Sequence, residues 1–153
     1  MTFVDADMAT RRQPGQIKLF GTDAFEGMRK AGQLTAKALD LLIDLVKPGV
    51  TTEFLDKTCF EFAMDHGAYP APLHYRGFTK SICTSINHVV CHGIPNDKPL
   101  RDGDIVNIDV TLVLDGWHGD SSRMYGVGEV PRRAERLMDV TYESLLRGIA
   151  AVK

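Results

Sequence analysis

The dipeptide Asp115-Gly116 constrains the fold of this chain more than any other feature of the sequence. Asp-Gly is favoured in the two-residue type I′ turn of a β-hairpin. Here it lies inside GDIVNIDVTLVLDGWHGDSS, residues 103–122. The sequence therefore predicts a hairpin with these two residues as its loop. That loop fixes the register through three cross-strand pairs: Leu114 with Trp117, Thr111 with Asp120, and Asp109 with Ser122.

This register predicts that two aspartates of the hairpin share one face. Opposed residues lie on the same face, and so do residues two apart along a strand. Asp109 and Asp120 become diagonal neighbours, with Cα atoms about 7–8 Å apart, and Thr111 between them could orient one carboxylate by a hydrogen bond. Either the two acids lie in water, or they bind divalent cations such as Mn, Mg, Fe(II) or Co, for which hard oxygen donors are suited.

The other face of the hairpin is mostly apolar, and we expect it to pack on helices. We also expect His118 there, on the opposite side from Asp120, and for that reason do not count it as a ligand. The remaining residues expected on this face are Ile108, Val110, Leu112, Gly119 and Ser121.

The rest of the chain predicts helices and short strands, hence an α+β fold with an antiparallel sheet and helices on one face. A helix is expected from a Thr22 cap to Pro48-Gly49, and another from Thr51 or Thr52 to Gly67. A third begins at about Pro131, which suits the first position of a helix. Three further segments are predicted: an extended arm over 1–21, and short strands in SICTSIN (81–87) and HVVCHGIP (88–95).

Composition narrows the class of protein. A net charge of -2 with scattered Lys and Arg argues against nucleic-acid binding. No apolar run approaches the roughly 20 residues of a membrane span, and the first residues do not resemble a signal peptide. The three cysteines, Cys59, Cys83 and Cys91, have no framework spacing and are typical of reduced thiols. We therefore expect a cytoplasmic protein with no membrane partner.

Two long segments together carry a family resemblance. SICTSINHVVCHGIP (81–95) and LRDGDIVNIDVTLVLDGWHGDSSRMYGVG (100–128) resemble type I methionine aminopeptidase, a dinuclear metallopeptidase with the pita-bread fold. The likeness extends over almost the whole chain from about residue 22, including VKPGVTTEFLD and YRGFTKSICTSIN. It implies that residues 22–153 are the N-terminal half of a truncated catalytic domain, the first half of a pita-bread fold.

The resemblance implies a metal-dependent exopeptidase that removes the N-terminal methionine from nascent proteins. Asp109 matches the family residue that chelates one metal, and Asp120 matches the one that bridges both. The implied cofactors are two divalent ions, with Co, Mn, Fe(II) and Zn all open. The substrates would be peptides or nascent chains beginning with Met, and a contact with the ribosome stays open.

Four further residues match family positions that meet the substrate. His92, in CHGIP, falls where the family has a catalytic histidine that hydrogen-bonds substrate near the scissile peptide and does not bind metal. Tyr75, Phe78 and Cys83 fall where the family lines the pocket for the methionine side chain. The family often has Tyr at the position of Phe78, so one hydroxyl is missing here.

The family's other ligands, one His and two Glu, and a second substrate His would lie beyond Lys153. We therefore expect the chain by itself to be inactive. One alternative is a non-catalytic, pita-bread-like protein-binding module, although such relatives typically lose the ligands that remain here as Asp109, Asp120 and His92. A proline-specific peptidase of the same fold would share the two aspartates but lack CHGIP.

Overall fold

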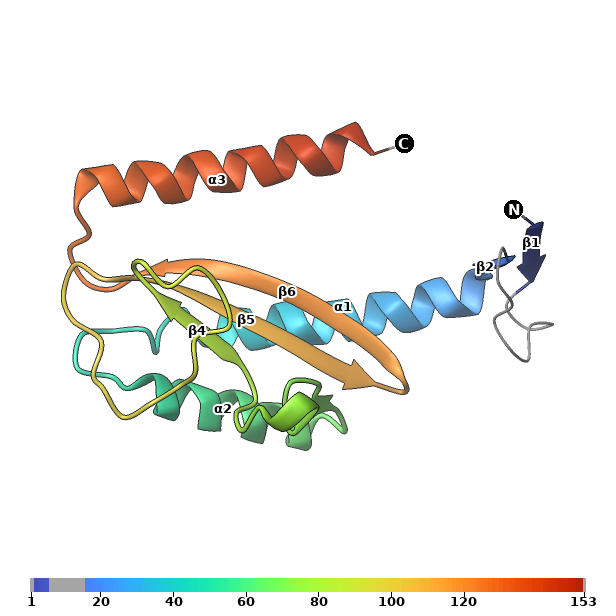
Figure 1. The fold of residues 1–153 in the computed structure, drawn as a ribbon, viewed down its shortest axis with the longest axis horizontal. Coiled ribbons are helices and arrows are strands. Elements are labelled where there is room, and N and C mark those ends of the chain that lie inside the picture. Colours follow the sequence, from blue (N-terminus) through green and yellow to red (C-terminus); the bar gives the residue numbers. More distant parts are fainter. Residues whose placement is uncertain (1, 6–15, 153) are drawn as a thin grey trace.

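The computed structural model describes residues 2–5 and 16–152, and Figure 1 shows their arrangement. Three helices, six strands and one short 3-10 turn are formed over these residues. In chain order they are β1 (Thr2–Asp5), β2 (Gln16–Leu19), α1 (Thr22–Leu41), α2 (Thr52–Asp65), β3 (Tyr69–Pro70), the 3-10 turn η1 (Tyr75–Gly77), β4 (Cys83–Ile86), β5 (Ile105–Leu114), β6 (Trp117–Gly126) and α3 (Arg132–Ala151).

The main sheet is antiparallel and is organised around β5. Strand β6 pairs with β5 along its whole length, while β3 and β4 pair with separate stretches of it. The Asp115-Gly116 turn has positive φ at both residues, 51° and 81°, as a type I′ turn requires. All three predicted cross-strand pairs are present, so the predicted register is confirmed.

Helix α1 covers one face of the hairpin and supplies much of the core. Its side chains at Ala31, Leu34, Ala38 and Leu39 are buried and follow helical spacing. They pack against the hairpin face formed by Ile108, Val110 and Leu112, each 0% exposed. Gly119 is buried on this face as predicted, whereas Ser121 is exposed.

Two details of the first predicted helix are wrong. The cap is Gly21 and not Thr22, and the helix ends at Leu41, well before Pro48-Gly49. Residues 42–45 continue as turns, so the Pro-Gly pair follows a turn and does not end the helix itself.

Helix α2 begins and ends as predicted. The Thr51 hydroxyl accepts a hydrogen bond from the backbone N–H of Phe54 at 3.2 Å, and Gly67 after the last turn has φ of 69°. Leu55, Cys59 and Ala63 are buried, and they join the core beneath the sheet. The cap satisfies one of the N–H groups that a helix start leaves free.

Replacing Thr51 with Ala removes that cap. We expect the Thr51→Ala protein to lose about 1 kcal/mol of unfolding free energy, the usual cost of losing an N-cap hydroxyl. Urea denaturation of wild type, Thr51→Ala and Thr51→Ser checks this, since Ser retains the hydroxyl. Equal stabilities for all three proteins would contradict the capping role.

The segment HVVCHGIP is not a strand, which contradicts the prediction. Asn87, just before the segment, and His92, within it, both have left-handed backbone, with φ of 51° and 54°. Two backbone hydrogen bonds attach the segment to β4, one from Thr84 N–H to the Gly93 carbonyl at 2.8 Å and one from Val89 N–H to the Ile86 carbonyl at 3.0 Å. Its β-branched residues fit a strand, but the two left-handed residues bend the chain around β4.

The prediction of helices on one face holds for α1 and α2. Helix α3 lies apart from them (Figure 1), and none of its residues is buried. Its apolar side chains are largely exposed, among them Leu137, Leu145 and Ile149. Within the described residues, no helix is both long and apolar enough to cross a membrane.

The predicted N-terminal arm is described only in part. Strands β1 and β2 form a parallel pair, so the arm contains some regular structure. Met1 and residues 6–15 of the predicted arm lie outside the described residues.

Candidate metal centre and substrate cavity

One cavity of about 900 Å³ contains every site residue predicted from the sequence. Its walls come from β5 and β6, the start of β4, the turn η1 and the loop after β4. The predicted residues that line it are Tyr75, Phe78, Cys83, His92, Asp109, Thr111 and Asp120.

The two aspartates lie on the cavity side of the hairpin. Asp109 pairs with Ser122 and Asp120 with Thr111, which makes the two acids diagonal neighbours. The Thr111 hydroxyl donates a hydrogen bond to Asp120 Oδ1 at 3.0 Å, as the orienting role predicts. Two carboxylates therefore face one cavity, and one of them is oriented by a neighbouring hydroxyl.

The electrostatics of this pair suit a bound cation. The pKa of Asp109 is raised above its ordinary value, chiefly by burial and next by the negative charge of Asp120, while His92 acts in the opposite direction. No ion pair neutralises either acid among the described residues. A divalent cation would relieve the repulsion, and carboxylate oxygens are donors that such ions accept.

The donor set on this chain is incomplete for a closed metal site. Over residues 2–5 and 16–152, no group of three His, Cys, Asp or Glu side chains is placed to hold an ion. The residues present therefore fit a metal as two carboxylate ligands, with further ligands required from elsewhere.

Cys83 lies next to the acids on the apolar side of the cavity. It is 8% exposed and pairs with Asp109 across β4 and β5. Burial first, and the negative charge of Asp109 second, raise the pKa of its thiol to about 11. The thiol is thus protonated at neutral pH and offers a packing surface to the cavity.

Tyr75 and Phe78 belong to a tight turn on the same wall. The turn has left-handed backbone at His74, Arg76 and Gly77, with φ of 67°, 48° and 85°. Tyr75 is 64% exposed, and the Arg76 guanidinium lies 5.4 Å from its ring centroid. The turn presents aromatic surface to the cavity beside the buried thiol of Cys83.

His92 is held on the cavity wall by a close approach of backbone. A Cβ at the next residue, Gly93, would collide with the carbonyl oxygen of Thr84 on β4. Only glycine fits this contact, which places the loop that carries His92 directly against the strand. The imidazole faces the same cavity as the two acids.

His118 was misplaced by the sequence prediction. It lines the cavity together with Asp120 and pairs with Val113. Residues two apart in a strand share a face, so the period that placed the aspartates together should also have placed His118 beside Asp120. The expectation that His118 lies on the other face from Asp120 is therefore wrong.

Comparison with known proteins identifies the family. The model of metallopeptidase family M24 matches residues 26–153. A methionine aminopeptidase of Rickettsia prowazekii is 59% identical over 137 residues, which are 90% of this chain and 53% of that protein. The chain therefore spans about half the length of the curated relatives it matches.

Solved structures agree with the fold. The crystal structure of methionine aminopeptidase from Rickettsia prowazekii aligns with a TM-score of 0.82 and 61% identity, over 84% of this chain and 52% of that one. The methionine aminopeptidase of Thermotoga maritima aligns with a TM-score of 0.84 and 34% identity, over 87% and 54%. The resemblance and the α+β pita-bread fold predicted from the sequence are confirmed, and the chain belongs to metallopeptidase family M24.

Proposed function

We propose that the protein at its full natural length removes the N-terminal methionine from peptides and nascent chains by metal-dependent hydrolysis. The observation that carries this proposal is the single cavity in which an acidic pair, Asp109 and Asp120, lies beside the buried thiol of Cys83. An ion site and an apolar side-chain pocket next to each other suit cleavage after one particular terminal residue. The similarity to methionine aminopeptidases supports methionine as that residue.

In this proposal the acidic pair holds two divalent ions, drawn from Co, Mn, Fe(II) or Zn, together with ligands outside this chain. Ions held there would supply Lewis acidity at the scissile carbonyl and would lower the pKa of a water molecule. Asp109 and Asp120 would hold the ions, and the hydrogen bond from Thr111 keeps the Asp120 carboxylate in one orientation. Family M24 is a metallopeptidase family, which supports the use of metal.

The substrate roles fall to the other cavity residues. His92 hydrogen-bonds the substrate near the scissile peptide. Tyr75, Phe78 and Cys83 surround the methionine side chain, since a thioether packs favourably on aromatic edges and polarizable groups. A reducing, cytoplasmic location agrees with the free state of Cys59, Cys83 and Cys91. Whether the protein contacts the ribosome is left open.

The function is tested by methionine release from Met-Ala-Ser. We expect the protein at full natural length to release methionine, to lose the activity after chelation and to regain it with added Co or Mn. The 153-residue chain assayed in parallel should give no measurable turnover, because its ligand set is incomplete. Turnover by the 153-residue chain would contradict the incomplete site. Peptide binding without turnover at full length would favour the non-catalytic binding module.

Phe78 tests the methionine pocket separately. We expect Phe78→Ala to raise KM for Met-Ala-Ser about tenfold, because truncating a packed aromatic loses an apolar contact of roughly 1.5 kcal/mol. Phe78→Tyr retains the ring and should change KM by less than about threefold. Steady-state kinetics of the three proteins check this. An unchanged KM in Phe78→Ala would place the methionine side chain elsewhere.

A further inference from the structure

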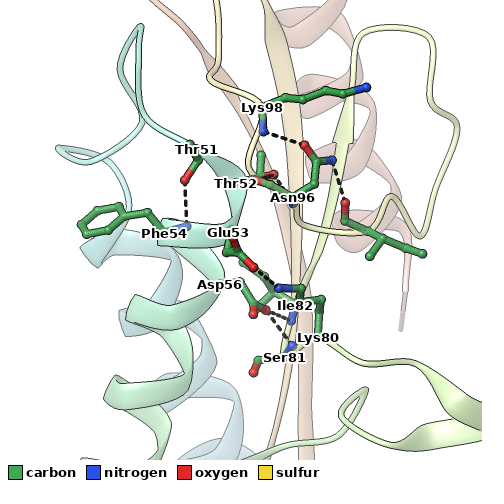
Figure 2. A network of polar contacts seen from close by, with 11 residues as sticks. Thr51, Thr52, Glu53, Phe54, Asp56, Lys80, Ser81, Ile82, Asn96 and Lys98 are labelled. Carbon is green, nitrogen blue, oxygen red and sulfur yellow. Dashed lines mark hydrogen bonds and ion pairs between the residues drawn. The ribbon is translucent and has the colours of Figure 1, made fainter.

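Asp56 is a buried acid that lies outside the cavity. It accepts hydrogen bonds from backbone N–H groups that lie next to the cavity wall (Figure 2). One oxygen, Asp56 Oδ1, accepts hydrogen bonds from the backbone N–H of Ser81 at 2.6 Å and of Ile82 at 3.0 Å. Asp56 is only 8% exposed, and Ile82 is 0% exposed. Hydrogen bonds to an ionised acceptor are among the strongest in proteins, so residues 81–82 are fixed firmly to α2.

The fixed residues lead directly into the cavity wall. Cys83 follows Ile82 and lies opposite Asp109 in the sheet. Before Ser81, residues 75–79 all line the cavity, and their turn includes backbone in the left-handed region. That turn is hydrogen-bonded mostly to itself, through His74 and Phe78. Asp56 therefore holds the point where this turn leaves the cavity and enters β4.

The same end of α2 also holds a second wall of the cavity. The Thr52 hydroxyl and the Glu53 N–H both contact the Asn96 carbonyl, at 3.2 Å and 2.9 Å, and Asn96 N–H returns a bond to the Thr52 hydroxyl. Asn96 follows the loop that carries His92 and Ile94, which both line the cavity. Lys80 adds an ion pair with Glu53 at 2.6 Å. Both walls are thus attached to one helix turn.

Burying the Asp56 carboxylate costs desolvation energy, and the needs of core packing alone do not explain why an acid is present here. Desolvation raises the pKa of its carboxyl, and the bonds from Ser81 and Ile82 and the charge of Lys80 offset this only in part. An apolar side chain at such a position often gives equal or greater stability. The geometry instead suits an acid that specifies where residues 81–82 lie.

We propose that Asp56 is a positioning residue for the substrate pocket: by binding the backbone of Ser81 and Ile82 it sets the place of Cys83 and of the 75–79 wall. This inference rests on the proposed function for its effect on the substrate. Its effect on the position of Cys83 does not depend on that function, and the two are measured separately.

The position of Cys83 is read from its alkylation by N-ethylmaleimide in the native protein at full natural length, with peptide mapping. Cys59, 1% exposed in the core, reports global unfolding in the same sample. In Asp56→Ala we expect the ratio of the Cys83 rate to the Cys59 rate to rise about tenfold, as expected when a charge-assisted contact is lost. Leu55→Ala, which creates a core cavity on the same helix turn, should leave that ratio unchanged.

The substrate effect is read from the kinetics of the same proteins. Asp56→Ala should raise KM for Met-Ala-Ser about tenfold with kcat changed less than about threefold, while Leu55→Ala keeps the wild-type KM. Asp56→Asn retains an acceptor oxygen without the charge, so it should recover most of the loss in both measurements. If Asp56→Ala does not fold, Asp56→Asn is compared with wild type, and a rise of about threefold in the ratio is expected.

Two results would overturn the proposal. One is an unchanged Cys83 to Cys59 ratio in the Asp56 variants. The other is an equal rise in KM in Leu55→Ala, which would make Asp56 a structural residue only. Absence of methionine release by the wild-type protein would instead defeat the proposed function, and the alkylation ratio would still decide whether Asp56 positions Cys83.

Discussion

Asp120→Asn in the protein at full natural length is expected to lower kcat/KM for Met-Ala-Ser by about a thousandfold or more. The reason is that Asp120 is a proposed metal ligand, and loss of several kcal/mol of charge stabilisation in the transition state corresponds to that factor. Asn retains an oxygen that can accept the bond from Thr111, so the local geometry of β6 is preserved. Affinity for Co or Mn, measured by calorimetry, should fall in parallel.

The same substitution should not destabilise the metal-free protein. The charge of Asp120 helps to raise the pKa of Asp109 above its ordinary value. A carboxyl whose pKa is raised by folding disfavours the fold increasingly as the pH rises above its unfolded value. Removing the Asp120 charge should therefore raise the metal-free Tm at pH 7, and the gain should fade toward acid pH, where Asp109 is protonated in both states.

Asp115→Asn is the matched control for this prediction. It makes the same change in the same hairpin, but in the turn, away from the cavity. Asn is well suited to the left-handed backbone there, with φ of 51°. We expect wild-type activity and metal affinity in this variant. Parallel losses of metal-free Tm and activity in Asp120→Asn would show that the acid is structural, and would contradict a role in binding metal.

The acidic pair could be predicted because its placement follows from local rules. A two-residue turn fixes the register, and the period of two then decides which residues share a face. Asp109, Thr111 and Asp120 required nothing beyond those rules. His118 obeys the same period, which places it on the same face as Asp120.

Features that depend on contacts between distant segments could not be predicted in this way. HVVCHGIP has the residues of a strand, but its path depends on Gly93 lying against Thr84 of another strand. Asp56 reads as an ordinary acid on a helix, since its partners are backbone N–H groups 25 and 26 residues away. The cavity beside the acids likewise arises only when the turn at 75–79 is placed against the hairpin.

The position of Gly119 depends both on local strand rules and on a contact between distant segments, and its substitution is expected to have a large effect. The sequence placed it on the face that packs on helices, and the structure shows how close that packing is. A Cβ at Gly119 would collide with the Ala31 carbonyl oxygen and lie 2.6 Å from the Thr35 hydroxyl. That hydroxyl also donates to the Gly119 carbonyl at 2.9 Å, so α1 and β6 meet backbone to backbone here.

We expect Gly119→Ala to lower the unfolding free energy by about 2–3 kcal/mol, the upper part of the usual cost of overpacking a core. The extra methyl must push α1 away from β6 and break the Thr35 bond. Gly32→Ala is the matched control, because it makes the same change on α1 where nothing lies within 4 Å. It should stabilise the protein by roughly 0.5–1 kcal/mol through the higher helix propensity of Ala.

Urea denaturation shows whether each variant has a lower or a higher unfolding free energy than wild type. Enzyme kinetics show how the same change affects activity at the site. Asp120 is the next residue after Gly119, so a shift of β6 that accommodates the methyl also shifts a proposed metal ligand. Gly119→Ala should therefore lose activity even at temperatures where it is fully folded, whereas Gly32→Ala should retain it. A Gly119→Ala protein as stable as wild type would mean that α1 is free to move outward, and that helix contact does not determine the position of the acidic pair.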